Sequence, residues 1–561
     1  MSRLHQYDYF VFFFYFIIVA AYGYWIYWKK KKKITDTKDF FLAEGSLTWW
    51  AIGASLIASN ISAEQFIGMS GSGFKMGLAI ASYEWMAALT LIIVAVFFMP
   101  VYLKNKIYTM PQFLNQRYNS TVAMIMAIFW LLLYVVVNLM SILYLGAIAV
   151  SGISGLSFYF CISMLAIFAI FITLGGMKVI GYTDVIQVFF LILGGLAATY
   201  LALDLLAEKS GESGMLAGFK ILRTQADDHF HMIFGRDNPN YMDLPGLTVL
   251  LGGMWIANLS YWGCNQYITQ RALGADLKTA RNGLLFASFL KLLMPIIVVL
   301  PGIAAFVLHE QGMFQTEMLD SKGNLDVNKA YPSLLNLLPI GLKGLAFAAL
   351  TAAIVASLAG KANSISTIFI LDIYKKAINK GASEQRQVFL GRMVVVVAMV
   401  IAVLLALVVG GKLMGEGKQG FQYIQEYTGF VSPGIFAMFF LGFFWKKTTS
   451  NAALFATIGG FVFSVVLKSL PKMMDLSFLA PIGFAKDNGT GVYEIPFLDR
   501  MGITFLLCIL GMWIISKVET SRGVVAKGLE LDRKMFKVDA RFAIGAIIAI
   551  GLLAALYIAY W

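Results

Sequence analysis

The feature that most constrains this chain is a series of long, almost purely apolar segments. The segments lack the alternation of apolar and polar residues that a membrane β-strand shows, so we expect helices rather than a barrel. Each is close to the ~20 residues that an α-helix needs to cross a bilayer. We predict fourteen spans, near residues 8–28, 47–73, 78–103, 121–151, 157–177, 183–207, 246–270, 280–308, 343–374, 387–410, 420–445, 450–470, 499–517 and 541–561.

Composition excludes a soluble protein, because 59% of the 561 residues are hydrophobic and only 13% are charged. We therefore predict an all-α membrane protein that forms a single transmembrane domain over residues 1–561. The first run, 8–28, lacks a basic leader and is followed by Lys29–Lys33, so we interpret it as a retained helix rather than a cleaved signal. Cys161, Cys264 and Cys508 all fall within predicted spans, which argues against a disulfide framework.

The net charge of +13 is best interpreted as topology. Lys and Arg are more frequent in the loops on the side of Lys29–Lys33, so the positive-inside rule places both termini outside. No predicted loop is long enough for a nucleic-acid-binding domain, and lipid headgroups are the expected partners of Lys29–Lys33. We expect the inner membrane of a bacterium.

Two predicted spans, the second and the seventh, are interrupted by polar residues. One carries Asn60, Glu64 and Gln65, and the other carries Asn258 and Ser260. A separation of five spans is typical of two inverted five-helix repeats with discontinuous helices, whose exposed backbone groups bind substrate and ions. The alternative is ordinary packing through small polar residues. The expected repeats are 47–207 and 246–445, with an additional helix at 8–28 and C-terminal helices over 450–561.

Ionisable residues at membrane depth are costly and each suggests a function. Together with nearby amides they suit a sugar, because hydroxyl groups both donate and accept hydrogen bonds while the apolar face of a pyranose covers an aromatic ring. Tyr261, Trp262 and Phe421 are the aromatic candidates. Any one of these residues also fits a purely structural role. The ionisable residues are Glu64, Glu84, Asp184, Lys291, Lys361 and Glu426, and the amides include Gln65, Asn138, Asn258 and Gln425.

Several long motifs resemble the sodium/solute symporter family, of the sodium/glucose cotransporter type. The resemblance extends from about residue 8 to about residue 470. The motifs are SNISAEQFIGMSGSG (59–73), ASYEWM (81–86), YTDVIQVFF (182–190), YWGCNQYITQR (261–271), FLKLLMP (289–295) and FQYIQEYTG (421–429).

This resemblance implies a sugar site, an inner gate at Tyr261 and an outer apolar gate of Met69, Tyr83 and Phe421. One implied sugar-contact position departs from the galactose-transporting type, which has Ser where this chain has Ala87. The implied sugar-binding residues are Asn60, Glu64, Gln65, Glu84, Asn138, Asn258, Tyr261, Lys291 and Gln425.

The resemblance also implies a sodium site, and the chain departs from it at two positions. Ala356 stands where the family has a second hydroxyl, and Lys361 follows one turn later. We predict that Lys361 pairs with Asp184 and substitutes for the ion; the alternative is that Lys361 snorkels to the cytoplasmic surface. The implied sodium ligands are the carbonyls of Ala58, Ile61 and Ala353 and the hydroxyl of Ser357.

The function we expect is an alternating-access, sodium-driven symporter of a hexose resembling glucose or galactose, with no cofactor beyond the coupling ion. Two alternatives stay open: sodium-independent or proton-coupled sugar transport through Lys361, and a membrane sugar sensor. An enzyme is not expected, because no metal-binding cluster or nucleophile motif stands out. The sugar, the stoichiometry and the oligomeric state are not predicted.

Overall fold

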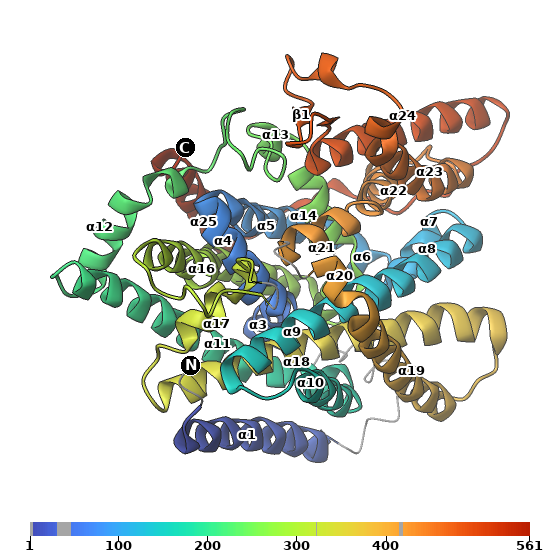
Figure 1. Ribbon diagram of the computed structural model, residues 1–561. Coiled ribbons are helices and arrows are strands. Elements are labelled where there is room, and N and C mark those ends of the chain that lie inside the picture. The colour runs from blue at the N-terminus through green and yellow to red at the C-terminus, as the bar shows by residue number, and fades with distance from the viewer. Residues whose placement is uncertain (1–3, 31–46, 321–322, 415–418) are drawn as a thin grey trace.

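Helices form nearly all of the chain in the computed structural model, which describes residues 4–30, 47–320, 323–414 and 419–561 (Figure 1). Lys31–Lys33, the last three residues of the predicted lipid-binding segment Lys29–Lys33, lie outside the described residues. This helical architecture follows from the bilayer, where every backbone N–H and C=O must be satisfied within the protein.

Ten helical runs in the described residues are long and apolar enough to cross a membrane, and there are eleven if one bent pair counts as a span. The predicted number of fourteen is therefore not confirmed. Breaks explain much of the difference, because α3 (Trp49–Asn60) and α14 (Gly253–Cys264) have only 12 residues each. α10 (Phe158–Thr173) has only 16 residues and is too short to be included. Helical segments also follow one another without a gap over Glu64–Lys104, so parts of two predicted spans are counted as one.

The first half of the chain begins with α1, which lies at one edge of the molecule (Figure 1). Its elements are α1 (Gln6–Lys30), α3, η2 (Glu64–Met69), α4 (Ser70–Met76), η3 (Gly77–Ala81), α5 (Ser82–Ile93), η4 (Val94–Phe98), α6 (Met99–Lys104), α7 (Met110–Arg117), α8 (Ser120–Leu132), η5 (Leu133–Leu139), α9 (Met140–Ser154), α10 and α11 (Gly176–Lys209). Short π-helical turns interrupt these helices, and two of them, η2 and η5, contain the polar residues Glu64, Gln65 and Asn138.

The second half contains the long central helices α16 and α18, and α23 and α24 lie on the side of the molecule away from α1 (Figure 1). A two-stranded antiparallel hairpin precedes α24. The elements are α12 (Met215–Gln225), α13 (Thr248–Leu251), α14, α15 (Gln266–Leu273), α16 (Leu277–Glu310), α17 (Ala330–Leu335), α18 (Leu342–Ile368), η8 (Phe369–Ile378), α19 (Glu384–Leu405), η9 (Ala406–Gly410), α20 (Gly411–Met414), α21 (Gly420–Thr428), α22 (Ser432–Phe444), α23 (Ser450–Ser469), β1 (Lys486–Asp487), β2 (Tyr493–Glu494), α24 (Phe497–Ser521) and α25 (Ala540–Ala559).

The first predicted interruption is confirmed. α3 ends at Asn60, and Ile61 adopts an extended conformation with φ −80° and ψ 111° before η2 begins at Glu64. The second interruption lies further along the chain than predicted. α14 continues through Asn258, whose Nδ2 donates to the carbonyl of Met254 at 3.1 Å, and the break occurs at Asn265, with φ −106° and ψ 124°.

A third break was not predicted. α21 and α22 form one span that is bent by 49°. The fold class that the sequence predicts, a helical membrane protein with discontinuous helices in a five-plus-five inverted-repeat core, is nevertheless confirmed. The repeat boundaries at 47–207 and 246–445 stay predictions.

Close helix packing holds the core together. α16 packs against α3, α4 and α5, and the backbone of α4 approaches it so closely that a Cβ on Gly302 would lie 2.0 Å from the carbonyl oxygen of Ser70. Small residues at such crossings are how membrane helices gain van der Waals contact without a hydrophobic driving force.

Arg117 at the end of α7 fastens this short helix to the turn between α22 and α23. Its guanidinium is fully buried and donates to the carbonyls of Gly442 at 2.8 Å, Trp445 at 2.8 Å and Thr448 at 2.9 Å. The carbonyl of Gly442 belongs to the last turn of α22, where acceptors lack an intrahelical partner, whereas that of Trp445 also accepts from the backbone N–H of Thr448 at 3.2 Å.

We predict that Arg117→Met destabilises the protein markedly, because each hydrogen bond to a charged group contributes roughly 1.5–3 kcal/mol. Thermal unfolding of the detergent-solubilised protein would show a lower transition temperature than for Arg386→Met, a control at an exposed arginine. Equal transition temperatures for the two variants would contradict the anchoring role.

Candidate functional site

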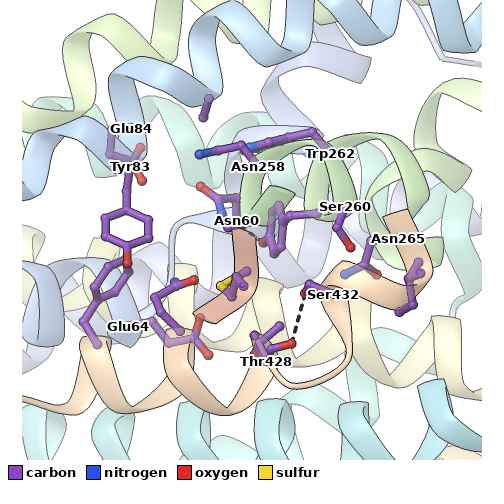
Figure 2. A pocket seen from close by; sticks show the side chains of 18 of the residues that line it. Asn60, Glu64, Tyr83, Glu84, Asn258, Ser260, Trp262, Asn265, Thr428 and Ser432 are labelled. Carbon is purple, nitrogen blue, oxygen red and sulfur yellow. Dashed lines mark hydrogen bonds between the residues drawn. The ribbon is translucent and has the colours of Figure 1, made fainter. Parts of the chain in front are cut away.

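A polar cavity lies in the middle of the bundle, between the breaks of α3 and α14 and the bent pair α21–α22. Figure 2 shows side chains from these elements pointing into it. Its lining includes eight of the nine predicted sugar-binding residues and two of the three predicted outer-gate residues. These are Asn60, Glu64, Gln65, Glu84, Asn258, Tyr261, Lys291 and Gln425, with Tyr83 and Phe421.

Lys291 forms the most completely buried charge in the cavity wall. Its ammonium group donates to Glu84 Oε2 and to Asn60 Oδ1, and it lies 5.1 Å from the centre of the Trp262 ring. Lys291 belongs to α16 and Glu84 to α5, and Asn60 is the last residue of α3. The pair therefore compensates two charges that would be costly alone and fixes three helices around the cavity.

Tyr261 extends this network toward the second helix break. Its hydroxyl accepts a hydrogen bond from Asn60 Nδ2 at 2.9 Å and contacts the hydroxyl of Tyr267 on α15. The hydroxyl of Tyr134 donates to Asn265 Oδ1 at the break itself. Hydrogen bonds thus run across the cavity from Glu84 to the α14–α15 junction.

Glu64 and Gln65 begin η2, directly after the first break. Gln65 Oε1 accepts from the backbone N–H of Ser62 at 3.0 Å, which caps the break and orients the amide. Glu64 Oε1 is buried without a hydrogen-bond partner among the described residues, and the ammonium of Lys361 lies 3.8 Å away. A buried oxygen of this kind is available to a ligand with hydroxyl donors.

Two of the three residues predicted to form the outer gate are in contact with each other. The rings of Tyr83 and Phe421 meet edge to face with centroids 5.0 Å apart, and the hydroxyl of Tyr83 donates to Gln422 Oε1 at 3.3 Å. Met69 is fully buried but does not belong to the cavity lining. Tyr83 and Phe421 thus form a packed aromatic pair in the cavity wall.

The predicted ion-binding residues lie where α18 crosses the end of α3. Ser357 donates its hydroxyl to the carbonyl of Ser59 at 3.0 Å, and Ala58, Ile61 and Ala353 are all buried. The hydroxyl of Ser59 is buried without a partner among the described residues. Carbonyl and hydroxyl oxygens, the ligands that hard cations prefer, are therefore concentrated at this crossing.

The predicted pair between Lys361 and Asp184 is wrong. Lys361 is fully buried, rather than snorkelling to the surface, and faces Glu64 and the ring of Tyr267, with its ammonium 5.0 Å from the ring centre. Asp184 is instead 3.7 Å from Arg271 and accepts a hydrogen bond from Ser55 at 2.6 Å. The cation next to Asp184 is therefore Arg271, and Lys361 faces Glu64 instead.

Asn138 is the one predicted sugar-binding residue that the cavity lining does not include. It is buried in η5, within the π-helical turn of the α8–α9 span. Sequence reasoning also missed lining residues that bear no charge and stand outside the recognised positions. They are Ala257, Asn265, Trp130, Leu133, Thr428, Gly429, Ser432, Ile435 and Met501, whereas Ala87, Ser260 and Trp262 also line the cavity and were singled out beforehand. Asn265, inside the motif YWGCNQYITQR, and Thr428, inside FQYIQEYTG, are polar residues of quoted motifs and could have been found from the sequence.

Residues 40–460 match the sodium:solute symporter family. The chain belongs to this family. It is 46% identical over 563 aligned residues to the sodium/glucose cotransporter of Vibrio parahaemolyticus, with 99% of this chain and 98% of that protein covered. It is 33% identical to the human sodium/myo-inositol cotransporter 2, with 78% of this chain and 66% of that protein covered.

The solved structure of a Na⁺-coupled sialic acid symporter, in a substrate-bound outward-open state, has a TM-score of 0.74 to this symporter. The two chains are 21% identical, and the likeness covers 92% of this chain and 98% of the other. The likeness supports the shared fold. Because the chain belongs to a family of symporters and has helices that can cross a membrane, it is an integral membrane transporter and not an enzyme.

We predict that breaking the Lys291–Glu84 pair destabilises the symporter, because the remaining charge is left buried alone. Lys291→Met and Glu84→Gln should each cost about 3–5 kcal/mol, and the double variant should recover much of that loss. The measurement is thermal unfolding of the four proteins in one detergent. Additive losses in the double variant would mean that the two side chains do not form a pair.

Proposed function

We propose that this symporter carries a sugar across the membrane by alternating access. The observation that supports this most strongly is the convergence of two carboxylates, several amides and an ammonium group on one cavity at the helix breaks. Such a set can satisfy many hydroxyl groups at once, and it would leave buried groups unpaired with a solute that lacks them. The names of the relatives, a glucose cotransporter and a myo-inositol cotransporter, agree with a polyhydroxylated cargo.

The expected contacts follow from the geometry. Glu84, Lys291 and Asn60 would hydrogen-bond hydroxyls on one side of the ring, while Gln65 and Gln425 would serve others. The Tyr261 ring would cover the apolar face of the sugar and act as the inner gate. Opening Tyr83 and Phe421 would admit sugar from the outside, and moving Tyr261 would release it inside.

Sodium is the coupling ion that we propose, since it drives the symporter family to which the chain belongs. The oxygens at the α3–α18 crossing support a cation site there, with Ala58, Ile61, Ala353 and Ser357 as ligands. In such a symporter, sugar and ion each raise the affinity for the other. We also propose a bacterial inner-membrane location with both termini outside. The identity of the sugar is left open by Ala87, which lines the cavity where a hydroxyl-bearing residue was expected.

A second candidate mechanism is sugar transport that is independent of sodium or coupled to protons. The observation that favours it is the buried ammonium of Lys361, one turn after Ser357 on α18 and 3.8 Å from Glu64. Two cations ~4–6 Å apart in a poorly solvated site repel strongly, so a charged Lys361 would weaken sodium binding nearby. In this mechanism the ammonium of Lys361 takes the place of the ion, and its partner is the carboxylate of Glu64 rather than that of Asp184.

The test of the proposed function is uptake of labelled D-glucose and D-galactose by proteoliposomes, with and without an inward sodium gradient. We expect concentrative uptake by the wild type and none by Gln65→Ala, because the lost buried amide costs at least roughly 1–3 kcal/mol of sugar binding. Gln387→Ala, at a buried glutamine on α19, is the matched control and should transport normally. Binding of sugar without any uptake would instead support a sensor.

Sodium dependence separates the two mechanisms. If Lys361 weakens the ion site, the wild type should depend weakly on sodium, and Lys361→Met with Ala356→Ser should depend on it more strongly, because the variant removes a cation and restores a hydroxyl. Uptake at graded sodium concentrations, in the double and both single variants, is the measurement. Strict sodium dependence in the wild type that neither substitution alters would exclude a role for Lys361.

A further inference from the structure

The helix α24 lies beyond residue 460, where the match to the symporter family ends, yet it reaches the central cavity. Met501, in its second turn, is part of the cavity lining. A C-terminal helix outside the repeats would ordinarily be an accessory that packs against the outside of the core. The contribution of a wall residue indicates a more direct role.

Met501 meets the bent helix pair at its bend. A Cβ added to Gly429, the residue after α21, would lie 2.9 Å from Met501 Sδ and 3.0 Å from the carbonyl oxygen of Glu426. The sulfur therefore rests against bare backbone where α21 turns by 49° into α22. A flexible thioether fills irregular space of this kind well.

The same end of α24 also meets the seventh predicted span. A Cβ on Gly253, the first residue of α14, would lie 2.1 Å from the carbonyl oxygen of Leu498. α24 packs against both α14 and α22 along its length. One helix thus touches two of the discontinuous elements that carry cavity residues.

Arg500, next to Met501, adds a charged contact to half-helix α21. Glu426 Oε1 accepts hydrogen bonds from Arg500 Nη2 at 2.5 Å and from Lys468 Nζ on α23 at 2.5 Å. The Arg500 side chain is 11% exposed, whereas that of Lys468 is 39% exposed, so the contact with Arg500 is the less screened of the two. Glu426 is one residue from Gln425 and five from Phe421, which face the cavity.

We propose that α24 completes the substrate site of the symporter. Met501 is a specificity-determining residue of the cavity wall, and Arg500 is a positioning residue that holds α21 through Glu426, so that Gln425 and Phe421 stand where the substrate needs them. This inference rests on the proposed sugar transport. It assigns a substrate-selecting role to a helix outside the matched family region.

The test of Met501 uses the full chain in proteoliposomes, with D-glucose and D-galactose as probes. Met501→Ala should change the ratio of the two KM values by at least about threefold, because pocket volume discriminates related ligands by such factors or more. Met512→Ala is the matched control, since Met512 is fully buried on the same helix but does not line the cavity. If Met501→Ala yields no monodisperse protein, Met501→Val, which removes less volume, is measured in the same way and should shift the ratio in the same direction.

The test of Arg500 compares Arg500→Gln, Arg500→Lys and the exposed control Arg522→Gln. We expect Arg500→Gln to raise KM about tenfold with little change in maximal rate, as expected for loss of ground-state binding. Arg500→Lys should retain most of the affinity. Arg500 makes a single contact to Glu426 Oε1, which the ammonium of a lysine can also make, and the two-pronged geometry of a guanidinium is not required. Glu426→Gln should reproduce the loss, and the Glu426→Gln, Arg500→Gln double variant should add nothing to it.

Suppose that the wild type takes up sugar. An unchanged ratio of the two KM values in Met501→Ala would then overturn the role of Met501, and a KM in Arg500→Gln equal to that of Arg522→Gln would overturn the role of Arg500. Either result would leave the proposed transport intact. Failure of the wild type to take up either sugar would instead overturn the proposed transport and this inference with it. The two failures are therefore distinguishable in a single series of proteins.

Discussion

The structure depends on one constraint: within a bilayer, a backbone can leave the helical conformation only where the protein itself surrounds it. Ile61 and Asn265, the extended residues of two breaks, are buried, and Asn60, Asn265 and Gly429, which lie at the two breaks and at the bend after α21, all line one cavity. Helix ends release carbonyl and amide groups, which attract polar side chains to the same place. The position of the site thus follows from the few points where the helices are interrupted.

Around the cavity, buried charges occur as neighbours of opposite sign, since an isolated charge would be too costly there. Lys291 with Glu84, Arg271 with Asp184 and Lys361 with Glu64 place three such contacts around the cavity and the proposed ion position. The first lies in the wall of the proposed sugar site, while the last joins the proposed ion position to a carboxylate that we propose binds sugar. A change in sugar or ion occupancy would therefore be felt by both sites through Glu64, which provides a physical route for coupling.

Local signals explain what the sequence predicted well. The interruption after Asn60 and the mid-span Glu84 and Lys291 stand out because polar groups are rare in apolar helices, and all three line the cavity. The partner of Lys361 could not be predicted, because spacing on α18 says nothing about which of two carboxylates on other helices lies nearer. Met501 was missed for a related reason: a methionine in an apolar helix carries no signal until the tertiary packing shows what it touches.

The central claim is that this cavity holds the transported sugar, and a structure of the symporter with saturating D-glucose or D-galactose tests it most directly. The account predicts density for one hexose bounded by Glu84, Lys291 and Tyr261, with the ring against the tyrosine face. Sugar density elsewhere in the bundle, or a cavity that stays unchanged while the sugar is bound at another site, would contradict it.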